Sequence, residues 1–293
     1  MDQVYLAHDP RLQRDVAIKV LPPSILTDDR ARSRFRKDAL ALAKLNHPGI
    51  ASIFDVGEEF GTAYIVMECV GGESLTERLK RGPLITAQTL DFGAQIAKAL
   101  TEAHETCVIH RDLKLANVMI TPKGQVKVLG FGLSKLLEQS DGEDLSRLRT
   151  ETGAAAGTPL YMSPEQVFGE AVDSGTDLWS LGVALYESLA GRRPFTGATD
   201  YALMLALSEQ TPPSIGSIRA DVPVPVAALV SKAMSRDLAT RYQTASALDA
   251  DATAILAALC APSQPKFAQR RKITPRVAIP SAIGVVALAA LAT

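Results

Sequence analysis

Cysteine is scarce in this sequence, and neither sign of charge is in excess. The 293 residues include three cysteines (Cys69, Cys107 and Cys260), which lie far apart and form no C-x-x-C pair. This pattern argues against a disulfide framework and a cysteine zinc site, and it favours a reducing compartment. The formal net charge of −1 gives no reason to expect nucleic acid as a partner. The first residues lack a basic segment followed by an apolar one, so we expect no secretory signal.

The remaining composition is that of a globular protein, with 47% hydrophobic and 22% charged residues. Residues 277–293 form the longest uncharged stretch, and five basic residues lie in the segment 266–276. A helix of that length spans roughly 25 Å, slightly less than a hydrocarbon core of roughly 30 Å. We predict a transmembrane helix over 277–293 after a basic linker over 261–276, whose charges favour the cytoplasmic side. A C-terminal helix packed on the preceding domain is the alternative.

Hydrophobic periodicity divides the chain into a strand-rich first part and a larger helical second part, which predicts an α+β fold. The boundary lies near residues 68–72. Strand-like runs cover 4–9, 15–21, 50–56 and 63–70, and an amphipathic helix fits 28–45. Later predicted helices cover 85–106, 177–190, 200–209, 224–235 and 244–258.

Residues 110–117 read HRDLKLAN, which matches the catalytic loop H-R-D-L-x-x-x-N of protein kinases. The chain therefore resembles a protein kinase. The resemblance implies that Asp112 accepts the proton of the substrate hydroxyl and that Lys114 lies against the transferred phosphate. It also implies that Asn117 binds a magnesium ion.

Other segments place the resemblance among bacterial (Hanks-type) Ser/Thr kinases of the receptor type, over about residues 4–256. They are GTP at 157–159, YMSPE at 161–165, DLWSLG at 177–182 and GRRPF at 191–195. The resemblance implies a bilobal fold, with a β-rich N-lobe over 1–70 and a helical C-lobe over 71–260. It implies transfer of the ATP γ-phosphate to Ser/Thr hydroxyls of protein substrates in signalling at the cell membrane. The kinase domain would face the cytoplasm, dimerisation is an option, and no nucleic acid is involved.

The segment Val-Ala-Ile-Lys at 16–19 matches the strand motif whose lysine holds the α- and β-phosphates of ATP. The resemblance pairs Lys19 with Asp38 on the next helix, where the family usually has the longer glutamate. ATP and Mg²⁺ are the implied cofactors. The implied ATP site is completed by Val4, Ala17, Met67, Glu68, Val70 and Met119.

The resemblance also implies regulatory and structural residues. Arg111 precedes the catalytic aspartate, which is the arrangement that binds a phosphorylated activation loop, and Thr150 and Thr152 are the expected acceptors. Phe131 should pack beneath the helix that carries Asp38. Structural roles are expected for Glu165, Asp177 and Arg241, the last as the partner of Glu165.

The sequence departs from the family pattern in two places. Gly130 stands where the D-F-G motif has its metal-binding aspartate, and glycine has no side chain to bind a cation. The Gly-rich loop is represented only by its last positions, with Asp2 in place of the third glycine, so we expect the first strand and the phosphate-covering loop to be missing. These departures predict weakened Mg-ATP binding. They leave two hypotheses open: an active Ser/Thr kinase, or an impaired pseudokinase that acts as a binding or scaffold module.

Overall fold

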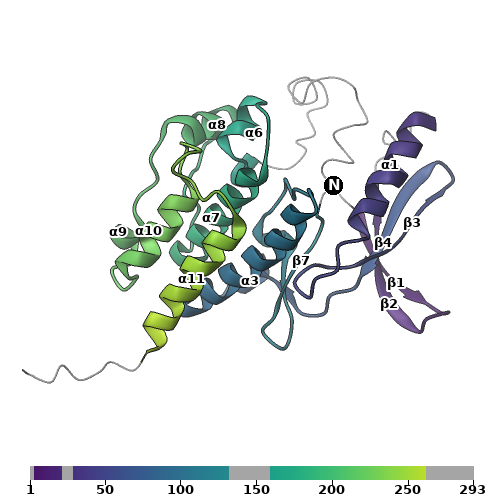
Figure 1. The fold of residues 1–293 in the computed structure, drawn as a ribbon, viewed down its shortest axis with the longest axis horizontal. Coiled ribbons are helices and arrows are strands. Elements are labelled where there is room, and N and C mark those ends of the chain that lie inside the picture. Colours follow the sequence, from purple (N-terminus) through teal and green to yellow (C-terminus); the bar gives the residue numbers. More distant parts are fainter. Residues whose placement is uncertain (1–2, 22–28, 132–158, 262–293) are drawn as a thin grey trace, which may run out of the picture. The chain divides into compact units, whose positions relative to one another are not determined.

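The computed structural model describes residues 3–21, 29–131 and 159–261 of the chain (Figure 1). The chain divides into two compact units, Met1–Cys260 and Ala261–Thr293, and the elements below belong to the first. Several predicted features lie outside the described residues: Asp2, Thr150, Thr152, most of the linker and the predicted helix over 277–293. In the described ranges, no helix combines the length and the apolar character needed to span a membrane.

The first part of the chain forms an antiparallel sheet in the order β1-β2-β4-β3. Its strands are β1 (Gln3–Asp9), β2 (Arg14–Val20), β3 (Ile53–Glu59) and β4 (Thr62–Glu68). Side chains alternate between the two faces of a strand, so every second residue of a half-covered strand can be buried. In β4 the buried residues are Ala63, Ile65 and Met67, which gives the sheet one covered face.

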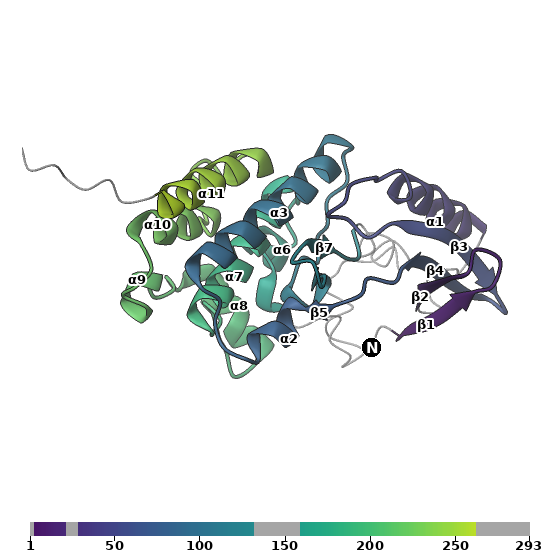
Figure 2. The ribbon, with the colours of Figure 1, turned by 90° about the horizontal axis from the view of Figure 1, so that it is seen from below.

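Helix α1 (Asp29–Leu42) lies alongside β3 in both views (Figures 1 and 2). Its buried side chains are Ala31, Phe35, Ala39 and Leu42. They recur at the spacing of three or four residues that forms one stripe of a helix. Its exposed side chains include several charged ones, namely Asp29, Arg30, Arg32, Arg36 and Lys37.

A second, three-stranded sheet has the order β5-β6-β7. It contains β5 (Glu73–Ser74), β6 (Val118–Ile120) and β7 (Val126–Val128). The segment after α1 is hydrogen-bonded to β7: Val128 N donates to Gly49 O at 2.8 Å, and Ala51 N donates to Val128 O at 3.0 Å. Val128 is fully buried, so these two bonds tie the strand-rich part to the helical part inside the core.

The second part is helical and is built around two long helices, α3 (Thr86–Glu105) and α7 (Ser174–Ala190). In α7 the side chains of Leu178, Trp179 and Leu181 are fully buried, which makes this helix central to the core. α11 (Ala245–Cys260) lies beside α3 in both views (Figures 1 and 2). The other described helices are α2 (Leu75–Leu79), α6 (Pro164–Phe168), α8 (Asp200–Glu209), α9 (Ile215–Ile218) and α10 (Val224–Ala233), with 3-10 turns at Leu115–Asn117 and Pro159–Tyr161.

The predicted fold class is confirmed: a small β-rich part precedes a larger helical part. Two differences have clear causes. The helix predicted over 28–45 ends at Leu42, since the chain turns before the His47-Pro48-Gly49 breaker. The short helix α6 was not predicted. It is fixed by a capping box, in which Ser163 accepts from Gln166 N while the Gln166 side chain accepts from Ser163 N.

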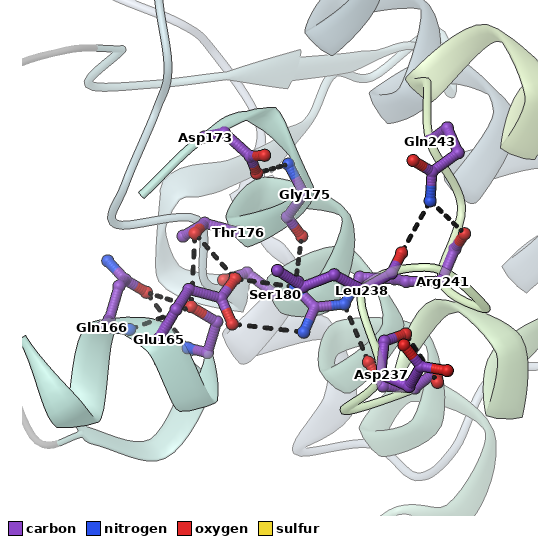
Figure 3. A network of polar contacts seen from close by, with 12 residues as sticks. Glu165, Gln166, Asp173, Gly175, Thr176, Ser180, Asp237, Leu238, Arg241 and Gln243 are labelled. Carbon is purple, nitrogen blue, oxygen red and sulfur yellow. Dashed lines mark hydrogen bonds and ion pairs between the residues drawn. The ribbon is translucent and has the colours of Figure 1, made fainter. Parts of the chain in front are cut away.

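A buried ion pair joins α6 to the segment before α11 (Figure 3). Arg241 donates two hydrogen bonds to the Glu165 carboxylate, at 2.7 and 3.2 Å, and Thr176 donates a third at 3.0 Å. Arg241 also donates to the backbone oxygens of Gly175 and Ser235 at 3.0 and 2.8 Å. Burial alone would raise the pKa of Glu165, but the hydrogen bonds from Arg241 hold it below its ordinary value.

Replacing Arg241 with methionine should lower the free energy of unfolding by about 3–5 kcal/mol, because it leaves the Glu165 carboxylate buried without its partner. Urea denaturation at neutral pH measures this loss. Because the folded-state pKa of Glu165 is depressed, its stabilising contribution is present above the ordinary carboxylate pKa and is lost as pH falls through the folded-state pKa. The difference between variant and wild type should therefore shrink below about pH 4.

The double variant Glu165→Leu, Arg241→Met is the control, since it removes both charges together. It should be more stable than the single Arg241→Met variant. A single variant as stable as wild type at neutral pH contradicts the importance of the pair.

Candidate active site

The loop between α3 and β6, residues 110–117, is fixed by one carboxylate from α7. Asp177 is fully buried and accepts hydrogen bonds from the backbone N–H groups of His110 and Arg111 at 2.8 and 2.9 Å. The His104 ring donates to the same carboxylate from Nε2 at 2.8 Å. Arg111 has a φ of +65°, a conformation that costs energy for any residue other than glycine. The bonds to Asp177 hold that conformation in place.

The three predicted catalytic residues lie together at the end of this loop. Lys114 Nζ contacts both carboxylate oxygens of Asp112, at 2.7 and 3.0 Å. Asn117 donates from Nδ2 to Asp112 O at 2.8 Å and to its carboxylate at 3.2 Å. The Asp112 side chain is 48% exposed, so its carboxylate can be reached from solvent. The arrangement places a carboxylate beside a lysine ammonium group. The carboxylate can accept a hydrogen bond from a hydroxyl, and the ammonium group can contact an anionic group.

The segment after β7 packs against the same loop. The Phe131 and His110 rings are 4.7 Å apart between centroids, and both side chains are buried. Burial lowers the pKa of His110, and the ring contacts Leu129 O from Nε2 at 2.9 Å. Leu129 N donates to Asn117 O at 2.8 Å. Phe131 is therefore buried against His110, and its predicted packing beneath the helix that carries Asp38 stays a prediction.

Gly130 lies between these two anchored residues with a φ of +80°. Across the described ranges, no three His, Cys, Asp or Glu side chains gather in a way that could hold a metal ion. The oxygen donors at the end of the loop are the amide of Asn117 and the Asp112 carboxylate, and that carboxylate already contacts Lys114. Magnesium is usually held by one or two protein carboxylates together with waters and the phosphates of the substrate, and Gly130 supplies no such carboxylate. The described residues therefore do not fit the magnesium site that the resemblance implies.

Lys19 and Asp38 are not brought together. Lys19 lies on β2 opposite Val4 and Ile65, and Asp38 is half-buried on α1. No ion pair joins the two among the residues that the structure describes. Aspartate is one methylene shorter than glutamate, which reduces the reach of α1 toward the strand.

The other residues of the predicted ATP site come from four strands and the segment after β4. Ala17 pairs with Leu6 of β1 and with Met67 of β4, which places it at the centre of the first sheet. Met119 lies on β6, opposite Lys127 and Ser74. The members of this set are all exposed or half-buried except Met67: Val4, Ala17, Glu68, Val70 and Met119.

Two contacts at the site involve residues that were not singled out from the sequence. Lys127 donates to the Glu68 carboxylate at 2.7 Å, which joins β7 to the end of β4. Gln166 donates from Nε2 to Arg111 O at 2.9 Å, which joins α6 to the catalytic loop. The S-x-x-Q pattern at 163–166 signals a capping box and could have drawn attention to Gln166. No sequence signal marks Lys127.

Known proteins similar to this chain are protein kinases. The family model "Protein kinase domain" matches residues 1–252. The chain is 39% identical over 261 residues to a probable serine/threonine-protein kinase of Streptomyces coelicolor, covering 87% of this chain and 38% of that protein. It is 40% identical over 273 residues to the serine/threonine-protein kinase PknA of Mycobacterium tuberculosis, covering 90% of this chain and 60% of that one. The chain thus spans less than two thirds of the length of each of these relatives.

Solved structures give the same result. The crystal structure of the Mycobacterium tuberculosis PknI kinase domain matches with a TM-score of 0.67 and 26% sequence identity. That match covers 87% of this chain and 91% of the other. Strand-rich and helical parts are therefore both shared with a known kinase domain.

Asp177→Asn should lower the free energy of unfolding by about 2 kcal/mol. The Asp177 carboxylate accepts three hydrogen bonds, and the amide of asparagine would direct its own N–H group at one or more of these donors. Thermal or chemical denaturation measures the loss. The matched control is Asp173→Asn at the N-cap of the same helix, where asparagine caps as well as aspartate. Equal effects of the two substitutions would contradict the anchoring role of Asp177.

Proposed function

The chain belongs to the protein kinase family, and from that premise we propose that it transfers the γ-phosphate of ATP to Ser/Thr hydroxyls of protein substrates. The observation that carries the proposal is the group formed by Asp112, Lys114 and Asn117 on a loop anchored to Asp177. This is the part of the site in which the family's chemistry resides.

In this proposal the Asp112 carboxylate orients the acceptor hydroxyl and takes its proton. Lys114, already 2.7 Å from that carboxylate, neutralises negative charge on the group being transferred. Asn117 holds the Asp112 backbone oxygen and so keeps the carboxylate in position. Lys19 would hold the α- and β-phosphates. No step is assigned to a metal ion, because Gly130 leaves the described residues without the carboxylate that would hold one.

A second candidate is a pseudokinase that binds partners without turnover. Gly130 favours it, since this position supplies no carboxylate where the family has its principal magnesium ligand. Losing one well-placed electrostatic group commonly costs about 100- to 1,000-fold in rate. The two candidates share the fold and differ only in turnover.

A phosphorylation assay with labelled ATP and a generic protein substrate should distinguish an active kinase from a pseudokinase, with Asp112→Asn as the blank. We expect wild-type turnover about 100-fold or more below that of a typical kinase, which turns over at about 1–100 per second. Gly130→Asp should raise both turnover and the magnesium dependence of ATP binding, the latter measured by thermal shift. Wild-type turnover in the typical range would show that Gly130 matters little.

The matched control for this substitution is Gly124→Asp. Gly124 also has a positive φ, +76°, but it lies in the turn between β6 and β7, and a Cβ there meets no atom. Its replacement imposes the same backbone strain without adding a carboxylate to the site. An equal response of the two variants to magnesium would remove the metal explanation.

We also propose that residues 277–293 anchor the protein in the cell membrane, with the kinase domain in the cytoplasm. The support is the uncharged run of 17 residues and the basic residues at 266–276 that precede it. Carbonate extraction of membranes should leave the full chain in the pellet and release a chain that ends at Gln264.

The control is the double variant Val285→Lys, Val286→Lys. Two lysines near the middle of the run should cost about 5–7 kcal/mol of insertion free energy, and should therefore release the protein. A full chain that is extracted by carbonate without detergent contradicts the anchor.

A further inference from the structure

Helix α1 contains one serine, and this residue lies on the charged side of the helix. Ser33 is in the second turn of α1 and is exposed. It lines a groove of about 720 Å³ in which Glu58 is the one carboxylate. The cationic lining residues are Arg32, Arg36, Lys37 and Lys44. A hydroxyl group is thus surrounded by more positive than negative charge, in a chain whose formal net charge is −1.

The two cations that follow this serine on the helix have no counter-charge from the described residues. Residues three and four positions apart lie side by side on a helix, so these neighbours are Arg36 and Lys37. In the described ranges neither takes part in an ion pair. The carboxylates that face the same surface, Asp29 and Glu58, both contact Arg32 at 3.2 Å. An anion added to the serine therefore meets two uncompensated cations, and the carboxylates nearby already have a partner.

The sequence before Ser33 is that of a kinase substrate with basic residues. Arg30 and Arg32 precede it by three residues and by one residue, and both are exposed. Carboxylates in the substrate groove of a protein kinase can bind such arginines. Helix α1 begins at Asp29, and the end of a helix opens more readily than its middle. An arginine-directed kinase can therefore both recognise this serine and reach it.

We propose that Ser33 is a phosphorylation site, modified by a protein kinase that selects arginine before the acceptor, and that the phosphoserine pairs with Arg36 and Lys37. The Ser33 Oγ forms a bond to the γ-phosphorus of ATP, and the bond from that phosphorus to the bridging oxygen of ADP breaks. ADP leaves, and the hydroxyl proton passes to the base of the modifying kinase and then to solvent. The phosphate adds a charge of about −1.5 to −2 at pH 7. Four cations and one carboxylate line the groove, so the groove keeps its positive sign.

Phosphorylation changes the electrostatics of α1 from repulsive to attractive. In the unmodified helix Arg32 and Arg36 are like charges four residues apart. A phosphate on Ser33 adds opposite charges at spacings of three and four residues, which stabilise a helix. The helix that carries Asp38 thus opens less often. The inference goes beyond the proposed function and needs no turnover by this chain, because another enzyme transfers the phosphate.

The acceptor is tested on the full chain with Asp112→Asn, which removes any turnover of its own. The chain is incubated with labelled ATP and a purified arginine-directed Ser/Thr kinase, and peptide mapping locates the phosphate. Ser235 is the internal control: Lys232 precedes it by three residues, but its side chain is half-buried and donates to Asp237 O at 3.1 Å. Ser33 should be labelled about tenfold more than Ser235, because it is the more accessible of the two. Equal labelling of the two serines would overturn the proposal.

The effect on α1 is measured by hydrogen exchange of its backbone amides, with and without phosphate on Ser33. Phosphorylation should slow the exchange by about threefold. In Arg36→Gln, Lys37→Gln most of this slowing should be lost, while the arginines before the acceptor still allow modification. The control Lys98→Gln, Lys123→Gln removes the same charge at exposed positions outside α1 and should keep the full effect. Exchange that the phosphate does not slow, or that it slows equally in both double variants, would also overturn the proposal.

Discussion

The catalytic loop depends on the buried carboxylate of Asp177. This side chain comes from α7, whose neighbouring residues Leu178 and Trp179 are fully buried, so the carboxylate is held by a helix that is buried along most of its length. Its oxygens accept from two consecutive backbone N–H groups and from His104. The left-handed conformation of Arg111 costs about 1 kcal/mol, and two charge-assisted hydrogen bonds more than offset that cost. Packing in the helical core thus determines where Asp112 points.

Gly130 removes a carboxylate from the site without changing the backbone geometry there. The residues on both sides of it are held without any contribution from a side chain at 130: Leu129 by backbone hydrogen bonds, and Phe131 by its contact with the His110 ring. A φ of +80° suits glycine, so the backbone loses nothing where the carboxylate is gone. Selection on the fold alone would therefore not detect the change. This is why an active and an impaired kinase have the same framework, and why only a chemical measurement tells them apart.

Much of the site could be predicted from the sequence, because its residues are local. Asp112, Lys114 and Asn117 lie within the short segment 112–117, so their closeness in sequence already places them close together in space. Contacts between distant segments carried no such signal. His104 lies 73 residues before Asp177, Lys127 lies 59 residues after Glu68, and Gln166 lies 55 residues after Arg111. Periodicity correctly gave the buried stripe of α1, but it sets only the direction of a side chain. It does not set the separation of helix and strand, so it could not decide whether Lys19 and Asp38 meet.

The electrostatics of helix α1 do little to hold it in place. Arg32 and Arg36 are four residues apart on its surface, a like-charge spacing that destabilises a helix by about 0.2–0.5 kcal/mol. Ion pairs from Arg32 to Asp29 and Glu58, each at 3.2 Å, offset that repulsion. The last turn of α1 contains no basic residue, so no cation there gains from the negative end of the helix dipole. The buried stripe of α1 therefore supplies most of what holds the helix on the sheet. Since Asp38 belongs to the same helix, its distance from Lys19 depends on that packing.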